Sequence, residues 1–168
     1  MLSKATIADI PALNFLVNSA YRGESSEKGW TTESHLLGGV RSTEEGLLET
    51  MQQSNVNILK FTTDGQIIGC VMLEQKPEKL YLGMLTVSPT LQGGGIGKQM
   101  LNAAVYEAKR LKLPKIGITV VSVRAELIAW YERHGYVATG QTEPFPMDDQ
   151  KFGLPKQFLE FIVMERLV

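Results

Sequence analysis

The chain has 168 residues, of which 43% are hydrophobic and 21% are charged, and its formal net charge is −1. This length predicts a single domain spanning residues 1–168, with enough residues to bury a core. The scattered, nearly balanced charge argues against nucleic acid as a partner, because phosphate binding needs a concentrated basic face.

The cysteine and histidine content limits metal and redox chemistry. Cys70 is the single cysteine, which excludes an internal disulfide and a cysteine-based zinc site. Two histidines are too few for a histidine-rich centre, so no metal is expected. No apolar run approaches the roughly 18 residues of a membrane span, and the N-terminal residues lack a signal-peptide stretch. We therefore expect no membrane partner and a cytoplasmic location.

The first third of the chain predicts helices around a polar segment. Thr6 can cap a helix whose apolar residues share one face. Residues 21–43 are polar and glycine-rich, which predicts a loop with a short helical turn at 32–37. The sequence 42–45 resembles a capping box at the start of a second helix. The expected elements are a strand at 2–5, a helix from about 7 to 20, and a helix from 44 to about 53.

The centre of the chain predicts antiparallel strands. Asp64-Gly65 is a strong hairpin signal between two apolar runs. Pro89 lacks an N–H, so strand pairing should stop near it. The expected strands are 56–62, 66–74 and 80–87.

The last part of the chain alternates helix and strand. Apolar residues between 95 and 111 follow a helical period, and Gly135 should end a second helix. The expected elements are a helix at 95–111, a strand at 115–121, a helix at 125–134, strands at 136–142 and 158–167, and a proline-rich loop at 143–156. A hairpin run followed by a strand-helix-strand crossover predicts a mixed α/β sheet.

A glycine-rich loop lies directly between the strand at 80–87 and the following helix. Glycines let the backbone approach an anion closely, and the N-terminus of the helix adds free N–H groups and the positive end of its dipole. Together these features suit a pyrophosphate. The loop residues that we expect to bind it are Gln92, Gly93, Gly94, Gly95, Ile96, Gly97 and Lys98.

Two other glycine-loop chemistries do not fit the spacing. A nucleotide-triphosphate loop needs Ser or Thr after Gly-Lys and a glycine five residues before it, but Gln99 and Gln92 occupy those positions. The dinucleotide fingerprint needs a third glycine where Lys98 or Met100 stands, depending on the starting glycine.

The pattern that fits is Gln-x-x-Gly-x-Gly, within a run from Leu85 to Lys98 that resembles motif A of the GNAT superfamily of N-acetyltransferases. The run from Ala129 to Tyr136 resembles motif B of the same family. The resemblance implies a GNAT-like mixed, strongly twisted sheet of about six or seven strands with helices on both faces. It also implies acetyl-CoA as acyl donor, bound in a cleft between the strands 80–87 and 115–121.

By this resemblance, the strand residues Leu85, Thr86 and Val87 contact the pantetheine arm and the thioester through their backbone. An N–H aimed at the thioester carbonyl stabilises the developing oxyanion, which is worth roughly 3 kcal/mol in other enzymes. Tyr131 is the implied general acid for the departing thiolate and also contacts the cofactor. Arg124 stands where many members carry an asparagine on the cofactor arm, so we expect it to contact either the cofactor or the substrate.

The acceptor side is expected in the segment 21–43, with Tyr21, Arg22, Glu24, Trp30 and Glu33 as substrate residues. An alkylammonium near pKa 10 is neutral only about once in a thousand molecules at pH 7, so a group must take its proton. Glu33 is the predicted catalytic base, with Glu24 and a water relay as alternatives.

The predicted function is acetyl transfer from acetyl-CoA to a primary amine of a small molecule, directly within a ternary complex. The loop at 143–156 should close a small site. One alternative is a catalytically silent CoA-binding or sensor domain, and another is a transferase for protein amino groups. The sequence allows a homodimer as well as a monomer.

Overall fold

The computed structural model describes residues 1–22, 29, 32–147 and 154–168. Its seven-stranded sheet has the order β1-β3-β4-β5-β6-β9-β7, and β2 and β8 form a separate two-stranded pair. The elements are β1 (Leu2–Lys4), η1 (Ile7–Asp9), α1 (Ile10–Tyr21), β2 (Leu37–Gly38), α3 (Glu44–Met51), β3 (Val56–Thr63), β4 (Gln66–Gln75), β5 (Leu80–Val87), η2 (Pro89–Leu91), α4 (Ile96–Arg110), β6 (Lys115–Val121), α5 (Ala125–Arg133), β7 (Val137–Pro144), β8 (Leu154–Pro155) and β9 (Glu160–Leu167).

Local sequence signals account for most of these boundaries. Asp64 and Gly65 both have positive φ, 51° and 77°, which is the geometry of a type I′ turn, and they join β3 to β4. The Thr43 hydroxyl accepts a hydrogen bond from the Gly46 N–H at 3.1 Å and caps α3. The predicted hairpin is therefore confirmed. The predicted capping box at 42–45 is wrong, because the N-cap is Thr43 and Gly46, which has no side chain to reach back, stands at the third helical position.

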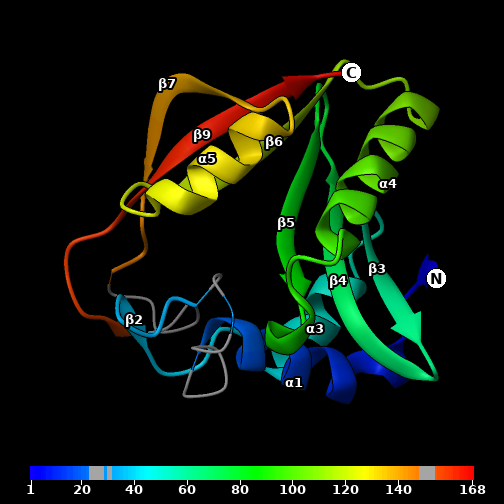
Figure 1. Ribbon diagram of the computed structural model, residues 1–168. Helices are drawn as coiled ribbons and strands as arrows, with labels where there is room; N and C mark the ends of the chain where they lie inside the picture. The colour runs from blue at the N-terminus through cyan, green and yellow to red at the C-terminus, as the bar shows by residue number, and fades with distance from the viewer. Residues whose placement is uncertain (23–28, 30–31, 148–153) are drawn as a thin grey trace.

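Helices cover both faces of the sheet, as predicted (Figure 1). Alternate side chains of β4 divide between the two layers because successive residues of a strand point to opposite faces. Cys70 packs with α1 and α3, whereas Val71 and Leu73 pack beneath α4. The layer beneath α4 also holds Tyr131 of α5, so α4 and α5 share one face.

The strands β5 and β6 diverge after a short paired stretch, and this divergence positions the site. They pair in parallel only at Leu80–Ile116 and Tyr81–Gly117. The register between β4 and β5 shifts between Cys70 and Met72, which inserts an extra residue into β5, and Met84 there has φ 52°. Such a bulge bends its strand. In Figure 1, β5 accordingly runs down toward α1 while β6 stays beside β9.

The segment 143–156 differs from the predicted proline-rich loop. β7 continues to Pro144, and Leu154–Pro155 pairs with Leu37–Gly38. Two-residue strands are too short to show a hydrophobic period, so the sequence pattern could not reveal them. No helix in the described part of the chain is both long enough and apolar enough to cross a membrane.

Candidate active site

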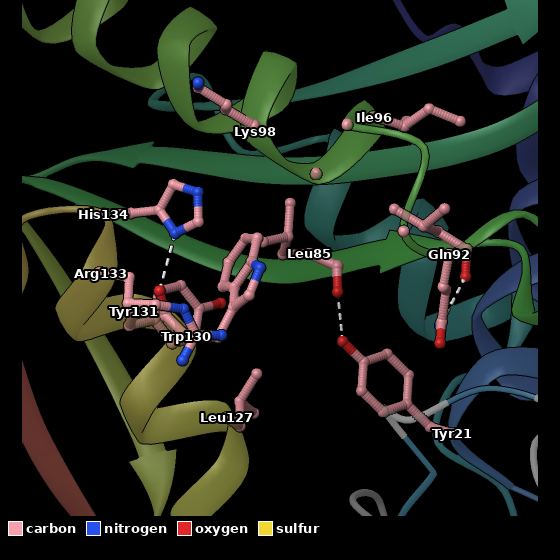
Figure 2. A pocket seen from close by; sticks show the side chains of 14 residues that line it. Tyr21, Leu85, Gln92, Ile96, Lys98, Leu127, Trp130, Tyr131, Arg133 and His134 are labelled. Atoms are coloured by element: carbon pink, nitrogen blue, oxygen red, sulfur yellow. Dashed lines mark hydrogen bonds between the residues drawn. The ribbon is translucent and has the colours of Figure 1, made fainter.

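A cavity of about 400 Å³ opens between the glycine loop, the end of β5 and α5. Figure 2 shows Trp130 and Tyr131 of α5, and His134 directly after this helix, on one side, with Tyr21 and Gln92 on the other. We call this space the donor cavity. It is bordered by Tyr21, Leu85, Val87, Gln92, Gly93, Gly95, Ile96, Gly97, Lys98, Leu127, Trp130, Tyr131, Arg133 and His134.

The glycines of the loop are required for two different reasons. Gly93 and Gly95 have φ of 93° and 82°, a region that side-chain-bearing residues rarely adopt, and Gly95 is the N-cap of α4. A Cβ on either would meet no atom within 4 Å, so backbone conformation alone demands glycine there. A Cβ on Gly97 would instead lie 3.2 Å from the Trp130 ring, so this glycine lets α4 pack against α5.

Positive charge gathers around the loop. α4 begins directly after Gly95, so its free N–H groups and dipole face the donor cavity. The side chains of Lys98, Arg133 and His134 border the same space. His134 Nδ1 lies 2.7 Å from the Trp130 carbonyl oxygen, which fixes the imidazole against α5. This combination fits the phosphates of an acyl-CoA. Sequence reasoning gave no role to Arg133 or His134, although both lie inside the motif B run.

Gln92 ties the loop to its surroundings. Its Nε2 donates to the Val87 carbonyl oxygen at 3.1 Å, which anchors the loop to the end of β5. A Cβ on Gly29 would overlap the Gln92 amide, so Gly29 lies directly against this side chain. The predicted loop glutamine therefore lies between the donor cavity and Gly29.

The predicted strand residues take separate positions. Leu85 and Val87 border the donor cavity. Thr86 is buried, and its hydroxyl donates to the Met84 carbonyl oxygen at 3.0 Å, so only its backbone is available to a ligand. The Leu85 carbonyl oxygen accepts a hydrogen bond from the Tyr21 hydroxyl (Figure 2). A carbonyl oxygen has two lone pairs, so it can accept a second bond from an amide of the pantetheine arm.

A second cavity, of about 270 Å³, lies where β5 and β6 diverge, and we call it the acceptor cavity. Across this opening, the Tyr81 hydroxyl and the Thr119 hydroxyl lie 2.9 Å apart and hold the two strands together. The two cavities share four bordering residues, which are Tyr21, Leu85, Leu127 and Tyr131.

Tyr131 therefore stands at the junction of the two cavities. Its ring packs edge-on against Trp130 and Tyr136, with centroids 5.1 and 5.4 Å away. Burial raises the pKa of Tyr131 well above its ordinary value of 10, and the neighbouring Tyr21, Tyr136 and Tyr81 raise it further. The hydroxyl consequently keeps its proton throughout the usual pH range.

A buried ion-pair cluster forms one wall of the acceptor side. Glu33 Oε1 lies 2.6 Å from Arg22 Nη1, and Glu33 Oε2 lies 3.3 Å from Arg124 Nη1. Burial, the largest cause, lowers the pKa of Arg22, and the contact with Glu33 opposes that shift. Among the described residues, Arg124 is placed beside Glu33 rather than on the donor cavity.

Of the predicted acceptor residues, Tyr21, Arg22 and Glu33 all border the acceptor cavity. Glu24 and Trp30 lie outside the described residues. Within the described ranges, no group of three or more His, Cys, Asp or Glu side chains is placed to hold a metal ion.

The sequence matches the profile of the Acetyltransferase (GNAT) family over residues 15–136, which is well over half of the chain. The chain belongs to the GNAT family. It is also 26% identical over 103 residues to an IAA acetyltransferase from Azospirillum brasilense, covering 60% of this chain and 67% of that protein. The predicted family is thereby confirmed.

Solved structures confirm the fold. The ribosomal-protein-S18-alanine N-acetyltransferase from Escherichia coli superposes with a TM-score of 0.73 at 15% identity, covering 100% of this chain and 93% of that one. The PaiA N-acetyltransferase from Thermoplasma acidophilum, in complex with coenzyme A, superposes with a TM-score of 0.72 at 18% identity, covering 100% and 98%. As a member of this family, the GNAT protein described here is an acetyl-CoA-dependent N-acetyltransferase.

The glycine loop can be tested by ligand-induced stabilisation. Acetyl-CoA should raise the melting temperature of the wild type, because a ligand that binds only the folded state stabilises it by mass action. Gly95→Glu should abolish this rise, since it places a negative side chain where a pyrophosphate would bind. Thermal denaturation with and without millimolar acetyl-CoA measures the effect.

The matched control is Gly65→Glu, because Gly65 also has a positive φ of 77° and open space around it but lies in the β3–β4 hairpin. Both variants should lose stability through backbone strain. Only the hairpin variant should keep the acetyl-CoA response. An equal rise in melting temperature with acetyl-CoA in both variants would contradict the role of the glycine loop in binding the pyrophosphate.

Proposed function

We propose that this enzyme transfers the acetyl group of acetyl-CoA directly to the primary amine of a small molecule, within a ternary complex. The observation that carries this proposal is the junction of the donor and acceptor cavities at Tyr131 and Leu85. A thioester delivered along β5 and an amine entering between β5 and β6 would meet there.

Direct transfer fits the residues at the junction. Neither cavity is bordered by a cysteine or a serine of the described chain. Cys70 is fully buried, and burial raises its pKa to about 12, so its thiol is a poor nucleophile. The acetyl group would therefore pass to the amine without an enzyme-bound intermediate.

The size of the acceptor cavity supports a small acceptor. Its volume of about 270 Å³ lies below the 300–1,000 Å³ that is usual for drug-sized ligands. Leu37, Phe145 and Phe161 border this cavity and belong to one apolar cluster. A small volume with an apolar part of its wall favours a small amine over a protein amino group. A protein substrate would need a groove open along its length.

We propose that Tyr131 assists the departure of the CoA thiolate. Proton transfer from a phenol with its ordinary pKa near 10 to a thiolate whose thiol has a pKa near 8.5 is uphill by roughly 2 kcal/mol. Burial raises the pKa of Tyr131 and makes complete transfer harder still. The Tyr131 hydroxyl would thus act by donating a hydrogen bond that strengthens as charge develops on sulfur. The backbone of Leu85 and Val87 would orient the pantetheine arm and stabilise the oxyanion.

Both carboxylate oxygens of Glu33 are engaged by guanidinium groups, those of Arg22 and Arg124. Such paired contacts hold the two arginines in a fixed arrangement. We infer that Glu33 positions Arg22 and Arg124, and that the amine proton leaves by way of water. The role of Glu33 as base remains the competing prediction.

The catalytic role of Tyr131 predicts a specific kinetic defect. Tyr131→Phe keeps the ring and its packing but removes the donor, so turnover should fall by roughly a hundredfold or more. The loss should appear in kcat, with acetyl-CoA affinity within a few-fold of wild type, because the hydrogen bond forms mainly in the transition state. Steady-state kinetics and a binding isotherm measure the two quantities.

Tyr136→Phe provides the control, since Tyr136 is equally buried and touches Tyr131 but borders neither cavity. Its turnover should stay near that of the wild type. If both variants turned over normally, Tyr131 would be a packing residue and not a catalytic one.

The raised pKa of Tyr131 also predicts the pH profile. Because the hydroxyl stays protonated above its ordinary titration range, wild-type kcat/KM should rise with pH as the acceptor amine loses its proton. The rate should then show no descending limb below about pH 10. A descending limb with an apparent pKa of about 10 or lower, absent from Tyr131→Phe, would show that the pKa of Tyr131 is not raised.

Glu33→Gln separates the two roles of this residue. If Glu33 positions the arginines, the variant should lose roughly 2 kcal/mol or more of stability, because two buried cations lose their charged partner. Its turnover should fall by a factor that stays constant with pH. Partial rescue at high pH, with little loss of melting temperature, would establish the base role instead. Exposed Glu78→Gln should change neither property.

A further inference from the structure

Among the described residues, three guanidinium groups lie on the acceptor side, those of Arg22, Arg41 and Arg124. Glu33 is the one buried carboxylate in the same part of the chain. Glu33 is already shared by Arg22 and Arg124. Arg41 borders the acceptor cavity and forms no ion pair with a carboxylate of the described chain. Glu143 also borders the cavity, but it is exposed on the edge strand β7.

The backbone around Arg41 is fixed in place by helix α1. Asn18 Oδ1 accepts hydrogen bonds from the N–H groups of Arg41 and Ser42 at 2.7 and 3.0 Å. Asn18 Nδ2 donates back to the Ser42 carbonyl oxygen at 2.9 Å. The guanidinium carbon of Arg41 lies 5.8 Å from the centroid of the Tyr21 ring. The backbone of this half-buried arginine is therefore anchored on α1, and its guanidinium lies beside Tyr21, which borders both cavities.

The surrounding electrostatics favour one further anion. Burial lowers the pKa of Arg22, and the nearby Arg41 lowers it further. Arg41 likewise lowers the pKa of Tyr21, although burial and Glu33 raise it overall to about 12. A guanidinium presents its donors in a planar fork that matches a carboxylate. A ligand carboxylate would reduce the repulsion among these cations, whereas a polycationic amine would increase it.

Resting on the proposed function, we propose that the acceptor is an amine that also carries a carboxylate, and that Arg41 binds this carboxylate. The amine would face the junction at Tyr131 and Leu85. The remaining apolar part would lie against Phe145 and Phe161, whose ring centroids are 5.1 Å apart and which both border the acceptor cavity. An α-amino acid with an apolar side chain has this combination of groups.

The experiment uses matched acceptors that differ only in the carboxylate. Initial rates with acetyl-CoA are measured for leucine and 3-methylbutylamine, for phenylalanine and phenethylamine, and for the two amino-acid amides. The wild type should prefer the acids in kcat/KM by about tenfold or more, the scale of a hydrogen bond to a charged group. Arg41→Gln should remove this preference mainly through KM, and should change the rate on the amines that lack a carboxylate less than the rate on the acids.

Arg110→Gln is the control, because this exposed arginine pairs with Glu107 on α4, away from both cavities. It should keep the wild-type preference. A wild type that prefers the amines without a carboxylate, or spermidine, would overturn the proposal. So would an Arg41→Gln variant with an unchanged preference for acids.

A binding measurement separates this inference from the proposed function. With CoA present, the products N-acetylleucine and N-acetylphenylalanine should raise the melting temperature of the wild type but not of Arg41→Gln, and neutral N-acetylphenethylamine should not distinguish the two proteins. If the acids stabilise through Arg41 and no amine is acetylated, the carboxylate site stands and the transferase proposal fails. If amines are acetylated and stabilisation by the acids does not depend on Arg41, the transferase proposal stands and the carboxylate site fails.

Discussion

The site depends on β5 leaving β6 after only two paired residues. The bulge at Met84 bends β5 while its pairing with β4 continues on the other edge. β6 remains paired with β9 along its whole length, from Lys115 to Val121. The sheet therefore opens in its interior rather than at an edge, and the opening is lined by backbone and by side chains of both strands. Without this divergence there would be neither a cleft for an acyl chain nor a path for an amine to reach it.

Two further features turn the opening into an active site. The glycine loop and the start of α4 provide an anion-binding surface at one end, where Lys98 adds positive charge. Tyr21 closes the other side by reaching from α1 to the Leu85 carbonyl oxygen, and it borders both cavities. Gln92 contacts both the end of β5 and the segment at Gly29. The donor and acceptor sides are thus in direct contact through ordinary packing and hydrogen bonds.

The sequence predicts those parts of the structure that follow local rules. Turn chemistry at Asp64-Gly65 and the helical period of α4 depend on neighbouring residues, and both are confirmed. The start of α3 is confirmed as well, although its cap is Thr43 alone and not the predicted box at 42–45. The family resemblance supplied the sheet and the acyl donor, which the family match and the solved structures confirm.

Contacts between distant residues could not be predicted in the same way. The ion pairs join Glu33 to residues 11 positions earlier and 91 positions later in the chain. Arg41 does not lie in a recognisable sequence motif. Its place on the cavity follows from hydrogen bonds between Asn18 of α1 and the backbone of the loop at 41–42. For Arg124, the sequence left cofactor and substrate as alternatives, and only the fold places it beside Glu33.

The central claim is that the thioester lies where the two cavities meet, between the backbone of β5 and the Tyr131 hydroxyl. A crystal structure of the enzyme with acetyl-CoA tests this most directly. We expect the pyrophosphate on the N–H groups between Gly93 and Lys98, the pantetheine arm along Leu85 and Val87, and the sulfur within hydrogen-bonding reach of Tyr131. An arm that lies outside the opening between β5 and β6, or a sulfur beyond the reach of Tyr131, would contradict it.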